Sequence, residues 1–137
     1  MVCIYCGSKT QITNSRPQGR SHSTWRRHHC ASCKATFTTQ ERVDLAASVA
    51  FTNNKGTDEP FVREKLLQSL YECLKHRPQA LTDALALADT VINTLLPKVN
   101  QASLPRNLVA QSAYQVLQRF DRAAAVQYRA YHPVPKA

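Results

Sequence analysis

The feature that most constrains the fold of this chain is a set of four cysteines near its N-terminus. They form two Cys-x-x-Cys pairs, Cys3 with Cys6 and Cys30 with Cys33, separated by residues 7–29. Two residues between cysteines let both thiolates of a tight turn point at one ion, and two such turns complete the tetrahedron of a structural zinc site. Because four protein ligands leave no open coordination position, we expect one structural Zn²⁺ and no catalysis at the metal.

Positive charge is concentrated in the same N-terminal region. Residues 1–40 contain lysines and arginines but no Asp or Glu, and the whole chain has a formal net charge of +9. This asymmetry is typical of a nucleic-acid-binding head on a nearly neutral body, with a merely solvated basic surface as the alternative. We therefore expect the N-terminal region to bind double-stranded DNA.

A strand over residues 24–29 would place an aromatic ring among basic side chains. Because side chains alternate along a strand, Trp25 and Arg27 would share one face and Arg26 would point to the other. Basic groups beside an aromatic ring suit contacts with phosphates and bases, although Trp25 could instead pack with Phe37 in a small core beside the zinc. The predicted DNA-binding residues are Arg16, Trp25, Arg26, Arg27 and Arg42.

Other uses of the cysteines fit the sequence less well. Two disulfides would require an oxidising compartment, and no export signal is visible. A thioredoxin-type pair requires a strand-to-helix setting, and an iron–sulfur cluster is less consistent with the paired spacing than zinc. We expect His28 and His29 to be exposed, facing DNA or solvent, rather than bound to metal, and Cys73 to be a core residue.

The remainder of the sequence predicts a short hairpin and four helices. Alternating residues predict a strand over 46–52, and a turn at 53–56 leads to a return strand near 59–61. Apolar residues at helical spacing, bounded by prolines and polar caps, predict helices over 61–76, over 82–96 with Thr82 as N-cap, after Ser103, and over 121–131.

The apolar stripes of these helices are expected to face a common core. The first stripe contains Leu66, Leu70, Cys73 and Leu74. Leu85 belongs to the second stripe, and Leu108 and Phe120 belong to the third. Packed together, they would form a compact helical bundle capped by the hairpin. The bundle contains no constellation typical of catalysis, so we expect a protein that is not an enzyme; a thiol oxidoreductase is the enzymatic alternative.

Several motifs together resemble the NrdR family of bacterial transcriptional repressors of ribonucleotide reductase genes. Besides the cysteine pairs, they are Asn14-Ser15-Arg16, Arg26-Arg27, Phe37-Thr38-Thr39-Gln40-Glu41-Arg42 and Glu59-Pro60-Phe61-Val62-Arg63-Glu64-Lys65-Leu66. The resemblance covers almost the entire chain in the order of the family. It implies a zinc ribbon that binds promoter DNA, followed by an ATP-cone that senses adenine nucleotides.

The resemblance further implies that ATP or dATP changes the state of a homo-oligomer and thereby its binding to an operator. Such coupling requires the two nucleotides to favour different assemblies. The family usually has two adjacent basic residues where this chain has Asn53 and Asn54, so we expect its triphosphate site to be weakened. The nucleotide-binding residues implied by the resemblance are Phe51, Asn53, Asn54, Lys55, Glu59 and Lys65.

Together these observations predict an α+β protein with a small N-terminal zinc ribbon and a mainly helical, ATP-cone-like domain capped by a β-hairpin. The expected limits are 1–45 for the ribbon, 46–132 for the cone and 133–137 for a flexible tail. We expect a cytoplasmic transcriptional regulator with no membrane association. The alternative is a zinc-stabilised nucleic-acid-associated or dimerisation protein whose nucleotide site has degenerated.

Overall fold

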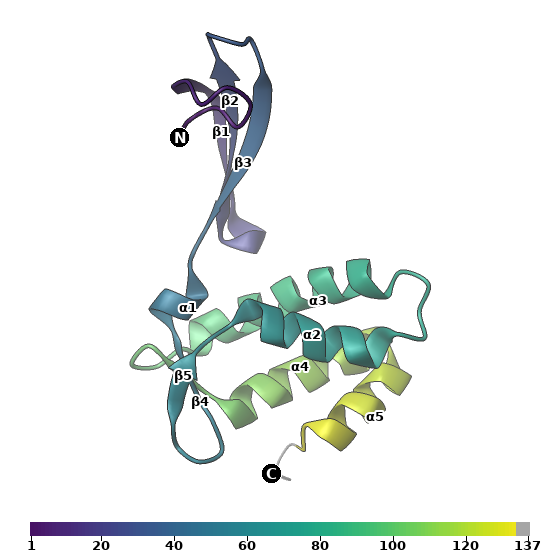
Figure 1. Cartoon of the computed structure of the whole chain (residues 1–137). Helices are drawn as coiled ribbons and strands as arrows, with labels where there is room; N and C mark the ends of the chain where they lie inside the picture. Colours follow the sequence, from purple (N-terminus) through teal and green to yellow (C-terminus); the bar gives the residue numbers. More distant parts are fainter. Residues whose placement is uncertain (134–137) are drawn as a thin grey trace. The chain divides into compact units, whose positions relative to one another are not determined.

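The structure, a computed structural model, describes residues 1–133 and divides into two compact units (Figure 1). The first unit comprises Met1–Val43 and consists of strands. The second begins at Asp44 and is mainly helical. The α+β class predicted from the sequence is confirmed. Within residues 1–133, no helix combines the length and apolar composition that crossing a membrane requires.

The first unit is a three-stranded antiparallel sheet in the order β1-β2-β3. Its strands are β1 (Thr10–Gln18), β2 (Ser23–Cys30) and β3 (Thr36–Arg42). A short 3-10 turn, η1 (Gly19–Ser21), connects β1 with β2. The buried hydrophobic cluster of this unit contains only Cys3, Cys30 and Phe37, so hydrophobic burial alone provides little stability.

A second small sheet in the order β5-β4-β6 lies at one end of the helical unit. Its strands are β4 (Ala50–Thr52), β5 (Asp58–Pro60) and β6 (Ser103–Pro105). The predicted hairpin is present as the antiparallel pair β4–β5, whereas β6 pairs in parallel with β4. The sequence analysis missed β6, because a three-residue strand ending in proline acquires its pairing only from a distant part of the chain.

The predicted strand over 46–52 is wrong in its first half. Residues Leu45–Ser48 form a helical turn, α1, because the Asp44 carboxylate accepts a hydrogen bond from the Ala47 N–H at 3.2 Å. This is an N-cap interaction, and it favours a helical start over an extended chain. The strand begins only at Ala50.

Four helices form the body of the second unit, close to the predicted ranges. They are α2 (Arg63–Leu74), α3 (Ala80–Leu95), α4 (Arg106–Phe120) and α5 (Arg122–Tyr131), with a 3-10 turn, η2 (Leu96–Lys98), after α3. Helix α2 packs on α3 and α5, and α4 packs on α3 and α5 (Figure 1). Thr82 is not the N-cap of α3, because the helix begins two residues earlier and Gln79 occupies the cap position.

The core of the second unit is continuous across all four helices. The predicted α2 stripe is confirmed, since Leu66, Leu70, Cys73 and Leu74 are all buried. The prediction is wrong for Leu85 and Phe120, which are about two-fifths exposed. The Phe120 ring lies 4.5 Å from the guanidinium carbon of Arg77 and is covered by this cation rather than by the core.

An ion-pair network connects the α2–α3 turn with the start of α5. Asp121 caps α5 by accepting a hydrogen bond from the Ala124 N–H at 3.0 Å, and its other carboxylate oxygen accepts from His76 at 2.8 Å and Arg77 at 3.2 Å. Arg77 also donates to Asp83 at 2.7 Å. The hydrogen bond from the Ala124 N–H contributes most to lowering the pKa of Asp121 to about 2, and those from His76 and Arg77 contribute less.

Candidate functional site

The two cysteine pairs of the first unit lie in tight turns with the same backbone geometry. After the first pair, Gly7 adopts φ 74° and its N–H donates to the Cys3 carbonyl at 2.9 Å. After the second pair, Lys34 adopts φ 63° and its N–H donates to the Cys30 carbonyl, also at 2.9 Å. Glycine adopts this left-handed conformation more easily than lysine does, so the second turn is the more constrained of the two.

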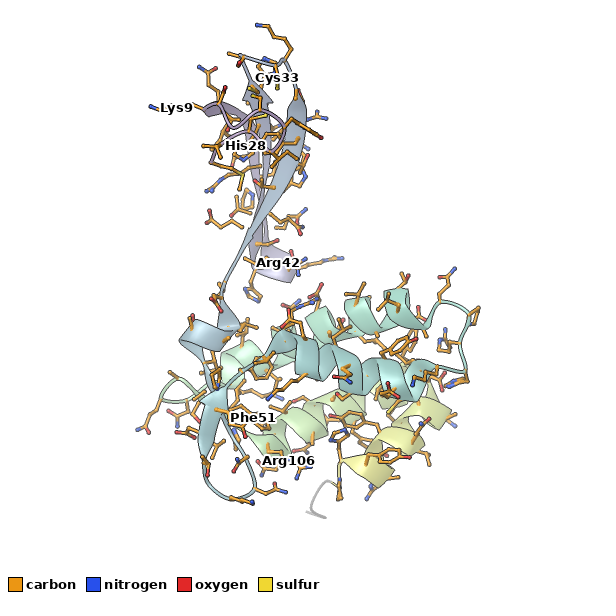
Figure 2. The ribbon with its side chains drawn as sticks, in the orientation of Figure 1. Lys9, His28, Cys33, Arg42, Phe51 and Arg106 are labelled. Carbon is orange, nitrogen blue, oxygen red and sulfur yellow. The ribbon has the colours of Figure 1, made fainter. Side chains whose placement is uncertain are left out.

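These turns bring the four free thiols together. Cys33, one of the four, is labelled in Figure 2. The sulfur atoms of Cys3 and Cys33 are 3.6 Å apart, those of Cys6 and Cys30 are 3.5 Å apart, and all four lie within 4.8 Å of one another. A zinc–sulfur distance of about 2.3 Å implies an edge of about 3.8 Å in a tetrahedral site. The thiols therefore fit one zinc ion.

The four thiols of the cluster differ in burial and in pKa. Cys3 and Cys30 are buried, whereas Cys6 and Cys33 are exposed. Hydrogen bonds from the Ser8 side chain and backbone lower the pKa of the Cys6 thiol to about 6, whereas desolvation and the neighbouring thiols raise the pKa of Cys33 to about 12. A zinc ion bound by these four residues would fasten the N-terminal turn to the sheet.

His28 does not face solvent or DNA, which corrects the prediction for this residue. Its ring is buried and stacked on Phe37, with centroids 5.2 Å apart and an interplanar angle of 8°. The two ring nitrogens lie 3.3 Å from the Thr10 hydroxyl and 2.9 Å from the Thr39 hydroxyl. Cross-strand pairing puts His28 directly opposite Phe37, so His28 completes the small core beside the thiol cluster.

One face of the first sheet collects most of the predicted DNA-binding side chains. Trp25 pairs with Arg16 across β1 and β2, and Arg27, two positions further on, shares their face. Arg42 pairs with Ser23, two positions before Trp25, and so belongs to the same face. Arg16, Arg27 and Arg42 are exposed and Trp25 is half-buried. We call these four residues the basic face.

Arg26 lies on the opposite face of the sheet, as the alternation predicted. It forms an ion pair with Glu41 of β3. Its side chain is 33% exposed, less than that of the Glu41 carboxylate at 63%. The Glu41 carboxylate offsets part of the charge that the Arg26 guanidinium could offer to a phosphate.

In the second unit, a cavity of about 220 Å³ lies between the β4–β5 hairpin and helices α2, α4 and α5. Of the residues implied by the resemblance, Phe51, Glu59 and Lys65 line it. The other three, Asn53, Asn54 and Lys55, lie in the hairpin turn and are not part of the lining.

The side chain of Asn53 is used to build the hairpin turn. Its carbonyl oxygen accepts hydrogen bonds from the N–H groups of Lys55 at 2.9 Å and Thr57 at 3.1 Å, and its amide donates to Glu59 at 3.0 Å. Lys65 approaches the other oxygen of Glu59 at 3.5 Å. Asn53, followed by Lys65, lowers the pKa of Glu59, which keeps this carboxylate ionised.

The lining residues that sequence reasoning did not assign to the site include Arg106, Tyr128 and His132. The rings of Tyr128 and His132 are stacked with centroids 4.4 Å apart. Burial raises the pKa of Tyr128 to about 12 and lowers the pKa of His132. Arg106 follows Pro105 at the start of α4, and only the folding of α4 and α5 onto the hairpin brings these residues together.

A zinc ribbon with a basic face, joined to a helical unit that contains a ligand-sized cavity, defines a two-part nucleic-acid-binding regulator. A family model described as "Transcriptional repressor NrdR-like, N-terminal domain" matches residues 1–41. The chain is 34% identical to the transcriptional repressor NrdR of Rhodospirillum centenum, over 93% of this chain and 82% of the relative. It is 30% identical to that of Ligilactobacillus salivarius, over 93% and 81%.

The chain therefore belongs to the NrdR family of transcriptional repressors. Its relatives are named for a regulatory role, so the protein is a regulator of transcription and not an enzyme.

Proposed function

We propose that this protein represses ribonucleotide reductase genes by binding their promoter DNA through the basic face of the zinc ribbon. The observation that carries the proposal is the convergence of Arg16, Trp25, Arg27 and Arg42 on one face of the sheet, in a unit whose first 40 residues contain no Asp or Glu. Arginines on such a face neutralise phosphates and release counterions, while the tryptophan can contact a base or sugar. Cys3, Cys6, Cys30 and Cys33 hold the zinc that keeps this face in shape.

The proposed effector is an adenine nucleotide, ATP or dATP, bound in the cavity of the second unit. Three features support it: the aromatic lining, the ionised Glu59 and the position of the cavity next to the hairpin. The proposal includes a homo-oligomer in the cytoplasm whose assembly, and hence operator binding, depends on which nucleotide is bound. Neutral Asn53 and Asn54 in the turn would make this site weaker for a triphosphate than a turn with two cations.

The direct test compares a DNA duplex from a promoter of ribonucleotide reductase genes in the same genome with an unrelated duplex of equal length. Zinc-loaded protein is titrated into each, alone and with ATP or dATP. We expect specific binding that one of the nucleotides changes. Equal affinity for the two duplexes under every condition would contradict the repressor proposal.

A second function is favoured by the neutral hairpin turn. If the nucleotide site has degenerated, the second unit acts only as a dimerisation module and the protein binds nucleic acid without regulation by nucleotide. Calorimetry with ATP and dATP on the wild-type protein separates the two cases. A working site binds at least one of the two nucleotides in the cavity, whereas a degenerate site binds neither.

A further inference from the structure

The charged residues around the cavity of the second unit are not equally available to a ligand. Glu59 is held from two sides, by Asn53 at 3.0 Å and by Lys65 at 3.5 Å. Because Lys65 is paired with this carboxylate, the two charges largely cancel at the edge of the cavity.

Besides Lys65, the residues that line the cavity include one other permanently charged cation, Arg106. It is half-buried at the first position of α4, and among residues 1–133 it has no hydrogen bond and no ion pair. Figure 2 shows Arg106 and Phe51 in the same part of the second unit, and both line the cavity. A half-buried guanidinium without an acidic partner is a strong site for a ligand anion, because its donors are not yet satisfied.

The rest of the lining suits a flat, uncharged group. Phe51, Phe61, Tyr128 and His132 contribute rings. Burial of the ring lowers the pKa of His132, and the positive charge of Arg106 lowers it further. The imidazole is therefore neutral at physiological pH. Ligand cavities of this kind combine an apolar surface for a planar group with a few polar groups that fix its orientation.

We propose that Arg106 binds the phosphate group of the nucleotide in this cavity, in place of cations in the hairpin turn. This inference rests on the proposed nucleotide-sensing function and assigns the anion to the start of α4, while the base lies among the rings. The hairpin turn is a poor alternative, because the Asn53 amide and carbonyl are both occupied in hydrogen bonds within the hairpin. The class of ligand is therefore a nucleoside that carries at least one phosphate.

The experiment uses the full-length, zinc-loaded protein and three variants. Arg106→Gln removes the cation, Arg106→Lys retains the charge without the planar fork, and Arg119→Gln is the matched control on the same helix. Arg119 is exposed and lies outside the cavity. ATP binding is measured by calorimetry, and the weaker binding of adenosine, which lacks phosphate, by NMR titration; thermal melting confirms that each variant is folded.

We expect Arg106→Gln to weaken ATP binding about tenfold or more while adenosine binding stays unchanged. Arg106→Lys should have an intermediate affinity, and Arg119→Gln should bind ATP like the wild type. If Arg106→Gln binds ATP normally, or if it loses ATP and adenosine to the same extent, the assignment of Arg106 is wrong while nucleotide sensing stands. If the wild type binds no ATP at low millimolar concentration, both are wrong, and the DNA titration then tests repression separately.

Discussion

The two units of this protein differ in the size of the hydrophobic core that stabilises them. In the ribbon, only Cys3, Cys30 and Phe37 form a buried hydrophobic cluster, and two of these residues are metal-ligand candidates. In the second unit, a buried core extends from Val49 to Tyr128 and includes residues from every long helix. A sheet of about 40 residues cannot bury enough apolar surface to fold alone, whereas four helices can.

Each unit should therefore respond to a different perturbation. Loss of the metal should unfold the ribbon and leave the helices folded. Truncation of a core side chain should destabilise the helices and leave the ribbon folded. The two proposed binding sites differ in the same way, since the proposed DNA surface is made of strands and the proposed nucleotide site is a cavity next to helices.

Removing one thiol from the cluster should have the largest effect. Cys33→Ala should lose zinc and unfold the ribbon, because zinc binding in small modules contributes about 10–16 kcal/mol of apparent free energy. Zinc content and NMR spectra of the two units check this. The control is Cys73→Ala. Cys73 lies in the helical core and is 2% exposed, so this variant should keep one zinc per chain. A folded, DNA-binding ribbon without metal would contradict the prediction.

A core truncation in the helical unit should destabilise that unit and leave the ribbon folded. Leu74 is fully buried, so Leu74→Ala should lower the free energy of unfolding of this unit by about 2–5 kcal/mol. Chemical denaturation followed by helical circular dichroism measures it. Leu81, which is 56% exposed, supplies the matched control, and Leu81→Ala should change stability by less than about 0.5 kcal/mol. A loss of zinc from the Leu74 variant would show that the units are not independent.

The two faces of the ribbon should differ in DNA binding. Replacing Arg16 and Arg27 with Gln should flatten the slope of log K against log salt by about 2, because each phosphate contact contributes about 0.9 to it. Arg26→Gln is the control from the opposite face, where the arginine is paired with Glu41, and it should change the slope much less. An equal effect of Arg26→Gln would assign DNA binding to both faces.

The smallest effect is expected at the network that holds α5. Asp121→Ala removes the N-cap and two ion pairs and should cost about 1–2 kcal/mol at pH 7. The pKa of Asp121 is lowered from 3.8 to about 2 in the folded state, so its contribution is complete above pH 3.8 and is lost as pH falls through 2. Urea denaturation at both ends of this range should show the variant and the wild type converging in acid.

The control for this prediction is Asp121→Asn, which can still cap α5 but has no charge for His76 and Arg77. It should lose less stability at pH 7 than Asp121→Ala. A difference between Ala variant and wild type that persists unchanged at pH 2 would mean that the charge of Asp121 does not stabilise the fold.

Much of the ribbon could be predicted from sequence because the relevant patterns are local. The spacing of the cysteine pairs requires only that two residues form a tight turn, and strand alternation assigns Trp25 and Arg27 to one face without knowledge of the partners. The limits of α2, α4 and α5 were close for the same reason, since helical stripes and prolines act over a few residues.

The predictions that failed depended on contacts between distant residues. His28 looks like an exposed histidine in the sequence, but its pairing with Phe37 of the next strand buries it. Phe120 fits the helical stripe of α4, yet the turn after α2 supplies an arginine that covers it at the surface. In neither case does the sequence near the residue contain the partner that decides its environment.

The family, the four-thiol cluster and the division into a strand-rich and a helical part could be predicted from the amino-acid sequence, because short-range spacing and amphipathic periodicity control these features. Which side chains meet became known only from the folded structure. It separated Arg26 from the basic face, engaged Asn53 in the hairpin turn, and brought Arg106 and His132 to a cavity with Phe51. These outcomes depend on which helix and strand surfaces pack together, a property of the whole chain that no local pattern contains.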